Sequence, residues 1–378
     1  MPEQANECNS QKDSVLFDLI VNEIEEGNGF ISFERYMELS LYHSDLGYYT
    51  RESHRVGKAG DFITSVSIGK CYGTILAHYF SSLIELQFSK EKQIVIVEFG
   101  AEYGDLAIDI MSELKNILND EQFQNLKYLV VEPFDSKRGK LKNRLVNEEF
   151  NNIIVIADLN EQNNLNGFVL GNEVLDAMPF KRVRFRNKKW VELGVGLEKS
   201  DKSLSLIEVE NGIQCELLSA WALDASNELP EGFTTEVNLC LNKFIESIYS
   251  SFSKVSGLFI DYGSTTDELI ASNRLGGTVR GYSDHKYITD LLASPGTHDI
   301  TANVNFDDFR LIAQRAGFEV IGPIEQYRFL TNAAKNWLID IEKSQMQRAD
   351  KEQIINQFKM LIHPTTMGRS FKMLEIQK

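Results

Sequence analysis

The chain has 378 residues, with 39 basic and 55 acidic side chains, so its formal net charge is −16. A hydrophobic share of 43% is enough for a packed core and excludes a wholly disordered chain, while the acidic balance argues against general nucleic-acid binding. No apolar run approaches the ~20 residues that a membrane helix needs, so we expect no membrane span.

The first fifteen residues are polar and mildly acidic. They lack the basic start and apolar core of a secretory signal and the arginines of a mitochondrial presequence, so we expect a cytoplasmic, bacterial protein. The four cysteines form no C-x-x-C pair, and the six histidines are scattered, which predicts reduced thiols and no metal site.

The amino-terminal part reads as helical. Apolar spacing predicts an amphipathic helix over 14–26, and Ser32 is placed to cap a second helix that ends before a Gly-Tyr-Tyr turn at 47–49. After a polar loop, a further helix is expected over 68–86.

Alternating strands and helices begin at residue 94. The β-branched run 94–99 predicts a buried strand, followed by a glycine turn and a helix from 105. Further predicted strands, with a helix at 136–146 between the first two, are 127–133, 152–159, 167–172 and 257–263. This order predicts a doubly wound parallel sheet, which binds ligands at the carboxyl ends of its strands. Two late strands, one in the segment 318–330 and one at 370–377, suggest an antiparallel edge, with a helical stretch at 331–360 between them.

Some 75 residues separate the fourth and fifth predicted strands, too many for an ordinary crossover. They contain two antiparallel-looking segments, 182–197 and 203–212, and a predicted helix around 236–253. We therefore predict an inserted substrate-cleft subdomain at 181–255 within a core of 91–180 and 256–378, preceded by a helical region at 1–90. A homodimer is possible.

The ends of the predicted strands carry candidate ligand-binding residues. The turn from Gly100 to Gly104 lets a ligand approach the backbone at a helix start. Glu132 ends the second strand, where an acid can accept ribose hydroxyl protons, and Asp158 ends the third, near an adenine position. Either acid alone is as consistent with a helix cap. A dehydrogenase is disfavoured, because Glu102 interrupts the G-x-G-x-x-G pattern.

The loop after the fourth strand places two acids, Glu173 and Asp176, beside the expected cofactor cleft. Paired carboxylates can hold a cationic nitrogen substrate. The alternative is a strand-to-helix cap made by Asn172 or Asp176. Two other segments, 57–64 and 276–301, are rich in Gly, Asp and Thr, and by themselves these residues are typical of turns.

Many segments in one order, from about residue 30 to 375, carry a resemblance to a known family. They include ISFERYMELSLYHSDLGYY, GDFITS, VEFGAEYGDLAIDI, VVEP, GNEVLDAMP, FIDYG, GTVRGY, PGTHDITANVNF and MGRSFKMLEIQK. On these motifs the chain resembles the MidA-like class I S-adenosylmethionine-dependent methyltransferases, the family of the mitochondrial complex I assembly arginine methyltransferase.

The resemblance implies a Rossmann-like methyltransferase sheet with S-adenosylmethionine as cofactor and a protein arginine, of a respiratory-complex type of partner, as substrate. It assigns catalysis to Glu173 and Asp176. The residues that it implies for cofactor binding are Gly60, Asp61, Phe62, Thr64, Glu98, Gly100, Ala101, Gly104, Glu132, Pro133, Asp158, Leu159 and Asn172.

The sequence departs from the family pattern at three positions. Glu102 stands where the family usually has glycine, and Asn303 and Asn305 replace a histidine and an aspartate. A glutamate that turns inward at 102 should weaken cofactor binding. The alternative hypothesis is therefore a weakened or inactive methyltransferase fold that acts as a binding or assembly factor.

Overall fold

The computed structural model describes residues 2–51, 64–148, 150–200, 203–224, 229–271, 275–283 and 286–378, without the side chains of 2–11 and 223–224. The predicted cofactor-binding residues Gly60, Asp61 and Phe62 lie outside the described residues.

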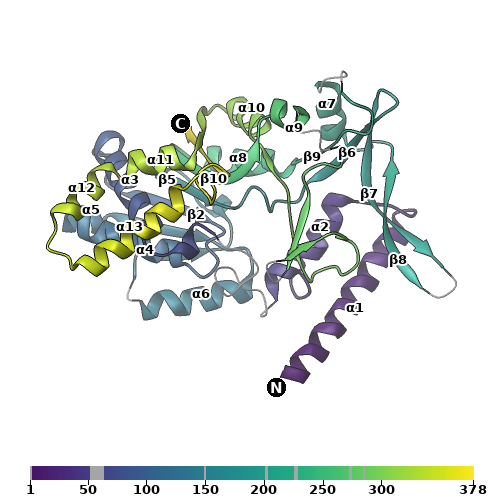
Figure 1. Ribbon diagram of the computed structural model, residues 1–378, viewed down its shortest axis with the longest axis horizontal. Helices are drawn as coiled ribbons and strands as arrows, with labels where there is room; N and C mark the ends of the chain where they lie inside the picture. The colour runs from purple at the N-terminus through teal and green to yellow at the C-terminus, as the bar shows by residue number, and fades with distance from the viewer. Residues whose placement is uncertain are drawn as a thin grey trace.

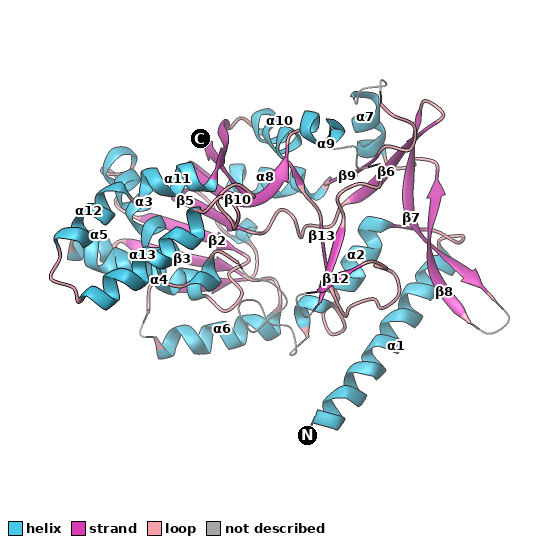
Figure 2. Ribbon diagram, viewed as in Figure 1, coloured by secondary structure: helices cyan, strands magenta, loops and turns pink. Residues whose placement is uncertain are grey.

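A mixed sheet of eight strands forms the centre of the fold, on the left in Figures 1 and 2. The strand order is β15-β16-β10-β5-β2-β3-β4, and β14 pairs with β10. The strands are β2 (Ile94–Phe99), β3 (Leu126–Val131), β4 (Ile153–Ile156), β5 (Leu165–Asn172), β10 (Phe252–Ser264), β14 (Val304–Asn305), β15 (Glu319–Glu325) and β16 (Phe371–Gln377). The five predicted core strands are parallel, as expected. The antiparallel strand is β16, which lies one place in from the edge strand β15.

Helices cover both faces of this sheet, because each buried strand sends alternate side chains to opposite sides. Ile96 of β2 packs with helices α3 (Cys71–Gln87) and α4 (Asp105–Ile117), whereas its neighbours Val95 and Val97 pack with α8 (Cys240–Ser251) and α10 (Phe306–Ala316). The first face also receives α6 (Asp135–Asn147), α11 (Gln326–Ala333), α12 (Lys335–Lys343) and α13 (Arg348–Ile362). This arrangement confirms the doubly wound α/β class.

A second, antiparallel sheet lies on the right in Figure 1, beside the amino-terminal helices α1 (Pro2–Glu26) and α2 (Phe33–Tyr42). Its strands are β1 (Ile31–Ser32), β6 (Lys181–Arg186), β7 (Lys189–Lys199), β8 (Leu204–Asn211) and β9 (Thr234–Val237). The predicted cap is present, since the Ser32 side chain accepts a hydrogen bond from Arg35 N at 3.1 Å. Leu16 and Ile20 of α1 pack in one cluster with Tyr36 of α2 and Val195 of β7.

Several predicted elements differ from the structure. The helix predicted at 236–253 begins only at Cys240, because Thr234–Val237 pairs with β6 as strand β9. That helix packs on the central sheet. The predicted division of the chain into domains stays a prediction. The helical stretch predicted at 331–360 begins earlier, at Gln326, and comprises three helices, α11 to α13. Part of the segment read as turns forms a small sheet of β11 (Arg280–Ser283), β12 (Lys286–Ile288) and β13 (Asp299–Thr301). Short helices not predicted are α5 (Asp120–Gln124), α7 (Glu216–Asp224) and α9 (Thr266–Ala271).

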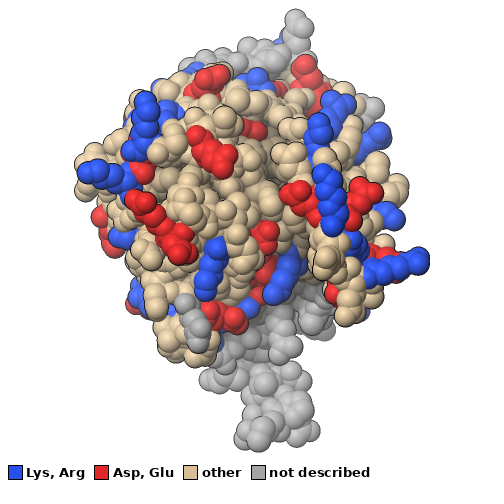
Figure 3. Space-filling view, turned by 90° about the vertical axis from the view of Figure 1, so that its left-hand side faces the viewer, with Lys and Arg blue, Asp and Glu red and all other residues tan. Residues whose placement is uncertain are grey.

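Some negative findings apply to the described part of the chain. None of its helices is long and apolar enough to cross a membrane, and it holds no group of three or more His, Cys, Asp or Glu side chains arranged to bind a metal ion. Cys71, Cys215 and Cys240 are free thiols. On the face shown in Figure 3, acidic and basic side chains are interspersed.

Candidate active site

A cavity of about 590 Å³ lies at the carboxyl ends of the parallel strands. It is called the first cavity. The predicted cofactor-binding residues that line it are Thr64, Glu98, Gly100, Ala101, Glu132, Pro133, Asp158 and Asn172, together with the predicted catalytic residue Glu173. Gly104, Leu159 and Asp176 do not line it. Most of the predicted ligand-binding positions therefore share one cavity.

The glycine turn after β2 forms one wall of the first cavity. Gly100 has a φ of 68°, and a Cβ there would lie 2.9 Å from Val174 Cγ2, so the turn leaves no room for a side chain. Gly104 begins α4 with a φ of 82°, and a Cβ there would lie 2.8 Å from Leu141 Cδ1 of α6. Gly104 thus allows two helices to approach and does not face the cavity.

Two buried carboxylates contribute to the floor. Glu98 accepts a hydrogen bond from the Tyr128 hydroxyl at 2.8 Å, and burial raises its pKa to about 7. Glu132 accepts one from Phe134 N at 2.9 Å through Oε1, and burial raises its pKa as well. A carboxylate acceptor at the end of β3 matches the role of binding ribose hydroxyl groups.

Asp158 and Leu159 follow β4. Asp158 Oδ1 accepts a hydrogen bond from Asn160 N at 2.9 Å, so it caps the short turn that follows while also lining the first cavity. Leu159 is buried in the core against α8 and does not reach the cavity. Both readings of Asp158, cap and cavity residue, hold at once.

Glu102 lines the first cavity, and its charge is paired. Its φ of 50° is the left-handed conformation that favours glycine. Its carboxylate Oε2 lies 3.8 Å from Lys137 Nζ on α6. Because this ammonium group offsets the added negative charge, the unfavourable effect on cofactor binding expected for an inward-facing glutamate is reduced.

The loop after β5 carries Glu173, which lines both the first cavity and a second one. Its φ is 53°, a strained conformation for a residue other than glycine, and its N–H donates to Ile260 O of β10 at 2.8 Å. Its Oε1 accepts hydrogen bonds from Ser65 N and Asn172 Nδ2, both at 3.3 Å. Burial, with the nearby charge of Asp176, raises the pKa of Glu173 to about 8.

The second cavity, of about 620 Å³, adjoins the first and shares Tyr49, Glu173 and Ala177 with it. Asp176 lines it. Its Oδ2 accepts hydrogen bonds from Tyr262 Oη and from Thr301 Oγ1, the latter at 2.7 Å, whereas its buried Oδ1 has no hydrogen-bond partner among the described residues. An acceptor buried without a donor fits a cationic ligand. Burial raises the pKa of Asp176, and these hydrogen bonds oppose that effect.

Asp261 at the end of β10 holds the loop between the two cavities. This buried carboxylate accepts three backbone hydrogen bonds, from Leu175 N at 2.9 Å, Asp176 N at 3.2 Å and Tyr262 N at 2.9 Å. Sequence reasoning included Asp261 only within the FIDYG motif and gave it no role. Its position at the end of the fifth parallel strand, beside the fourth, was the available signal.

Tyrosines form a further set of residues that the sequence did not assign. Tyr49 donates to Asp299 Oδ1 at 2.7 Å, Tyr42 to Ala177 O at 2.6 Å and Tyr72 to Asn172 Oδ1 at 2.8 Å. Each joins the amino-terminal region to a segment that lines a cavity. Aromatic residues in helices are usually core residues, so their role becomes visible only in three dimensions.

The two asparagines that depart from the family pattern have structural partners. Asn303 Oδ1 accepts a hydrogen bond from Arg280 Nη2 at the second cavity. Asn305 caps α10, accepting from Asp307 N at 3.1 Å and Asp308 N at 3.4 Å. Asparagine is a preferred N-cap residue, so the substitution at 305 retains that structural role.

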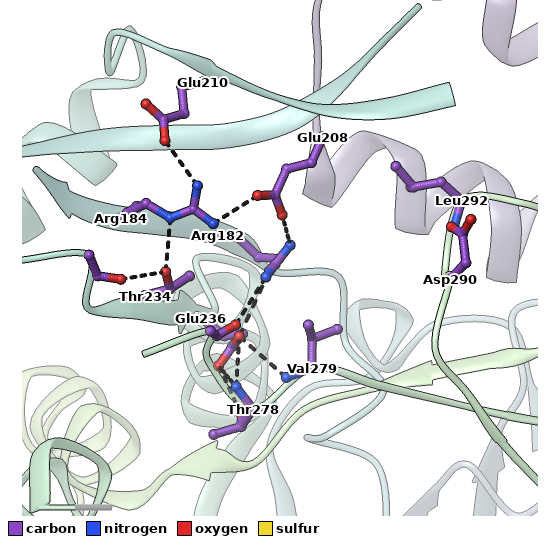
Figure 4. Close-up of polar contacts among 12 residues, drawn as sticks. Arg182, Arg184, Glu208, Glu210, Thr234, Glu236, Thr278, Val279, Asp290 and Leu292 are labelled. Carbon is purple, nitrogen blue, oxygen red and sulfur yellow. Dashed lines mark hydrogen bonds and ion pairs between the residues drawn. The ribbon is translucent and has the colours of Figure 1, made fainter. Parts of the chain in front are cut away.

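Figure 4 shows how the second sheet fixes the segment that leads to Arg280. Glu236 of β9 accepts hydrogen bonds from Thr278 N at 3.0 Å and Thr278 Oγ1 at 2.8 Å. Thr278 Oγ1 in turn accepts from Asn303 N at 3.0 Å. The Arg182 guanidinium lies 3.9 Å from Glu236 and bonds Glu208 at 2.6 Å. The second sheet therefore anchors one wall of the second cavity.

These residues fit S-adenosylmethionine. A Cβ added at Gly100 would take up space at the turn that the glycine leaves open. The carboxylate of Glu132 lines a cavity of suitable size at the strand ends, where nucleotide ligands bind. The cavity is lined by carboxylates, backbone groups and aromatic rings, which suit an adenosyl group with an amino-acid tail.

Comparisons with known proteins agree. Residues 75–324, more than half of the chain, match the model of an S-adenosyl-L-methionine-dependent methyltransferase family. The mitochondrial protein arginine methyltransferase NDUFAF7 of Xenopus tropicalis is 23% identical, over 99% of this chain and 89% of its own length. The human protein of that name is 26% identical, over 92% and 80%.

A solved structure gives the same result. A Burkholderia thailandensis protein, described as a methyl transferase and bound to S-adenosyl-homocysteine, has a TM-score of 0.84 and 25% identity, covering 98% of this chain and 93% of its own. The chain belongs to the MidA-like family of S-adenosylmethionine-dependent methyltransferases, and S-adenosylmethionine is its cofactor.

Proposed function

We propose that this methyltransferase methylates a guanidinium nitrogen of an arginine in a protein substrate. The observation that carries the proposal is the second cavity, which opens beside the first and has the carboxylates of Glu173, Asp176 and Asp299 in its lining. The naming of its relatives as protein arginine methyltransferases supports the choice of arginine.

The chain's own residues divide the work. Glu132 and the turn at Gly100 would hold the cofactor, which supplies an activated methyl group. Glu173, common to both cavities, would hold the target guanidinium by charge-assisted hydrogen bonds and orient one nitrogen toward the first cavity. The unpartnered Oδ1 of Asp176 offers a second acceptor.

Burial gives Glu173 a further role. Its pKa of about 8 means that the free protein holds much of it protonated at neutral pH, and an arriving guanidinium favours its ionised form. The positive charge of the substrate thereby draws Glu173 into the state that binds it. A guanidinium presents its donors in a fixed planar fork that matches a carboxylate, whereas a lysine ammonium is a compact point charge.

The test is transfer of label. Purified protein, labelled S-adenosylmethionine and an extract from cells that lack the protein are combined, and labelled polypeptides are hydrolysed to identify the modified amino acid. We expect methylarginine, at a yield reduced at least ~100-fold by Glu173→Gln. Label on another amino acid would overturn the arginine assignment. Absence of label from a protein that binds the cofactor would favour the alternative, a binding or assembly factor.

The predicted cytoplasmic location and the respiratory type of substrate both stay predictions. A homodimer likewise stays a prediction.

A further inference from the structure

We propose that the second cavity selects an arginine whose neighbour in the substrate protein carries a carboxylate, and that Arg280, Arg369 and Lys372 bind that carboxylate. The inference rests on the proposed function, since it takes the target arginine to enter by this cavity. It adds a rule for which arginines are accepted.

The first observation is that the cavity carries both signs of charge. Its lining is acidic near the first cavity, where half-buried Glu173 and buried Asp176 lie, and Asp299 adds a second buried carboxylate. Three cations line the same cavity and come from two other segments, β11 and the stretch at the start of β16. The cavity thus carries three cations beside four acids, although the chain as a whole has a net charge of −16.

The second observation is that these cations are weakly paired. Arg369 is exposed and makes no ion pair or hydrogen bond with any residue the structure describes. Lys372 Nζ lies 4.0 Å from Glu325, at the limit of an ion pair. Arg280 bonds a neutral acceptor, Asn303, and stacks 5.1 Å from the Tyr262 ring, and its charge acts on Asp176 without an ion pair within 4.0 Å. The fourth acid of the cavity, exposed Glu268, already accepts from Thr265 N at 2.9 Å.

The third observation is a pair of buried atoms of opposite character. Asp176 Oδ1 is an acceptor, and Arg280 Nε a donor, and neither has a hydrogen-bond partner among the described residues. Both residues line the second cavity. A ligand that satisfies both must bring a donor and an acceptor together, since a buried polar atom left unpaired costs free energy. A guanidinium followed by a carboxylate does so in one short peptide.

A free anion is a poorer match for the same cations. Phosphate would meet the carboxylates of Glu173 and Asp176 in the same cavity, and like charges at short range repel. A peptide that carries both charges gives each wall its complement. Opposite charges across an interface favour one register of binding over others.

The experiment uses the full-length protein with S-adenosylhomocysteine and fluorescent nonapeptides of Gly and Ser with one central Arg. One set carries Glu at a single position within three residues of the Arg, and matched sets carry Gln or Lys there. Anisotropy titrations give the affinities. We expect one Glu position to bind about threefold to tenfold tighter than its Gln counterpart, with the gain reduced at high salt.

Two charge reversals sharpen the test. Arg369→Glu should abolish the Glu preference and favour the Lys peptide, because the side chain is exposed and its reversal leaves the core intact. The matched control, Arg348→Glu on α13, reverses a side chain that is 92% exposed and lies outside both cavities, and should keep the Glu preference.

The outcomes separate the two proposals. Equal affinity for Glu and Gln peptides at every position, with an Arg-to-Ala peptide still binding more weakly, would overturn the neighbour rule and leave arginine recognition standing. Affinity that does not depend on the central Arg would overturn both. A Glu preference that persists in Arg369→Glu, or one that is lost equally in Arg348→Glu, would refute the assignment to these cations.

Discussion

The two cavities that share Glu173 are built in different ways. The first cavity is lined largely by the carboxyl ends of β2 to β5, which are neighbours in one sheet and occur within 79 residues, Ile94–Asn172. The second draws on Tyr49, the end of β10, the strands β11 and β13, and the residues before β16. Regular topology thus fixes the first cavity, whereas contacts distant in sequence fix the second, the proposed substrate side. Mutations should therefore separate cofactor affinity from turnover.

The largest effect is expected for a substitution of Glu173, which lines both cavities. Glu173→Gln keeps the shape of the side chain but removes the charge that holds the guanidinium, so kcat should fall by about 10²–10³. Cofactor affinity, measured by calorimetry, should change by less than about threefold. Glu268→Gln, an exposed acid of the second cavity, is the matched control and should leave kcat within about threefold. Equal losses of turnover and cofactor affinity in Glu173→Gln would contradict the role.

The substrate side should depend on β10. Asp261→Ala removes the acceptor of three backbone N–H groups, and we expect the free energy of unfolding to fall by about 2–4 kcal/mol. Chemical denaturation measures this. Asp158→Ala removes one exposed cap on the cofactor side and should cost no more than about 1 kcal/mol. Similar losses in the two variants would show that the loop does not rely on Asp261.

The cofactor side should respond in affinity alone. Glu132→Ala removes a carboxylate that can accept ribose hydroxyl protons, so the Kd for S-adenosylhomocysteine should rise about tenfold to 100-fold. At saturating cofactor, kcat should stay within about threefold of the parent value. A fall in kcat with an unchanged Kd would show that Glu132 contributes to turnover and not to cofactor binding.

The pH dependence should mark the shared residue. With a pKa of about 8, Glu173 in the cofactor-free protein gains its charge as pH rises through that value. The affinity for an arginine peptide should therefore increase about eightfold between pH 7 and 8.5, as the ionised fraction grows. In Glu173→Gln this eightfold increase should be lost. A decrease with rising pH in the parent protein would rule out this carboxylate as the binding group.

The smallest effect is expected for a substitution of Glu102, which lines the first cavity. Glu102→Gly relieves a left-handed backbone but adds unfolded-state entropy and removes the ion pair with Lys137, so these contributions nearly cancel. Stability should change by less than about 1 kcal/mol and cofactor Kd by less than about threefold. A gain of tenfold or more in affinity, seen by calorimetry, would mean that Glu102 does obstruct the cofactor.

The same contrast explains how far the sequence could be interpreted. Runs such as 94–99 and the acid at Glu132 predict strand ends, and strand ends of a parallel sheet converge, so most of the predicted ligand-binding residues lie in the first cavity. Tyr49 and Asp299 are 250 positions apart, and no local pattern indicates their hydrogen bond. Asn305 and Asp158 carry cap signals that are local, yet a cap motif does not reveal whether its side chain also lines a cavity.

Strand β9 shows the limit for secondary structure as well. Its four residues, Thr234–Val237, precede an amphipathic helix, and the apolar spacing of that helix obscured a strand whose pairing with β6 is set by distant residues. Tertiary context decides such short segments.

Because Glu173 borders both cavities, it makes them thermodynamically linked sites. Any ligand that stabilises the ionised carboxylate in one cavity changes the affinity of the other cavity by the same factor in return, since coupling free energies are reciprocal. The number of protons that Glu173 releases when one ligand binds then depends on whether the other ligand is already bound. Because the charge on Glu173 depends on pH, the size of this coupling should change with pH without any movement of the backbone.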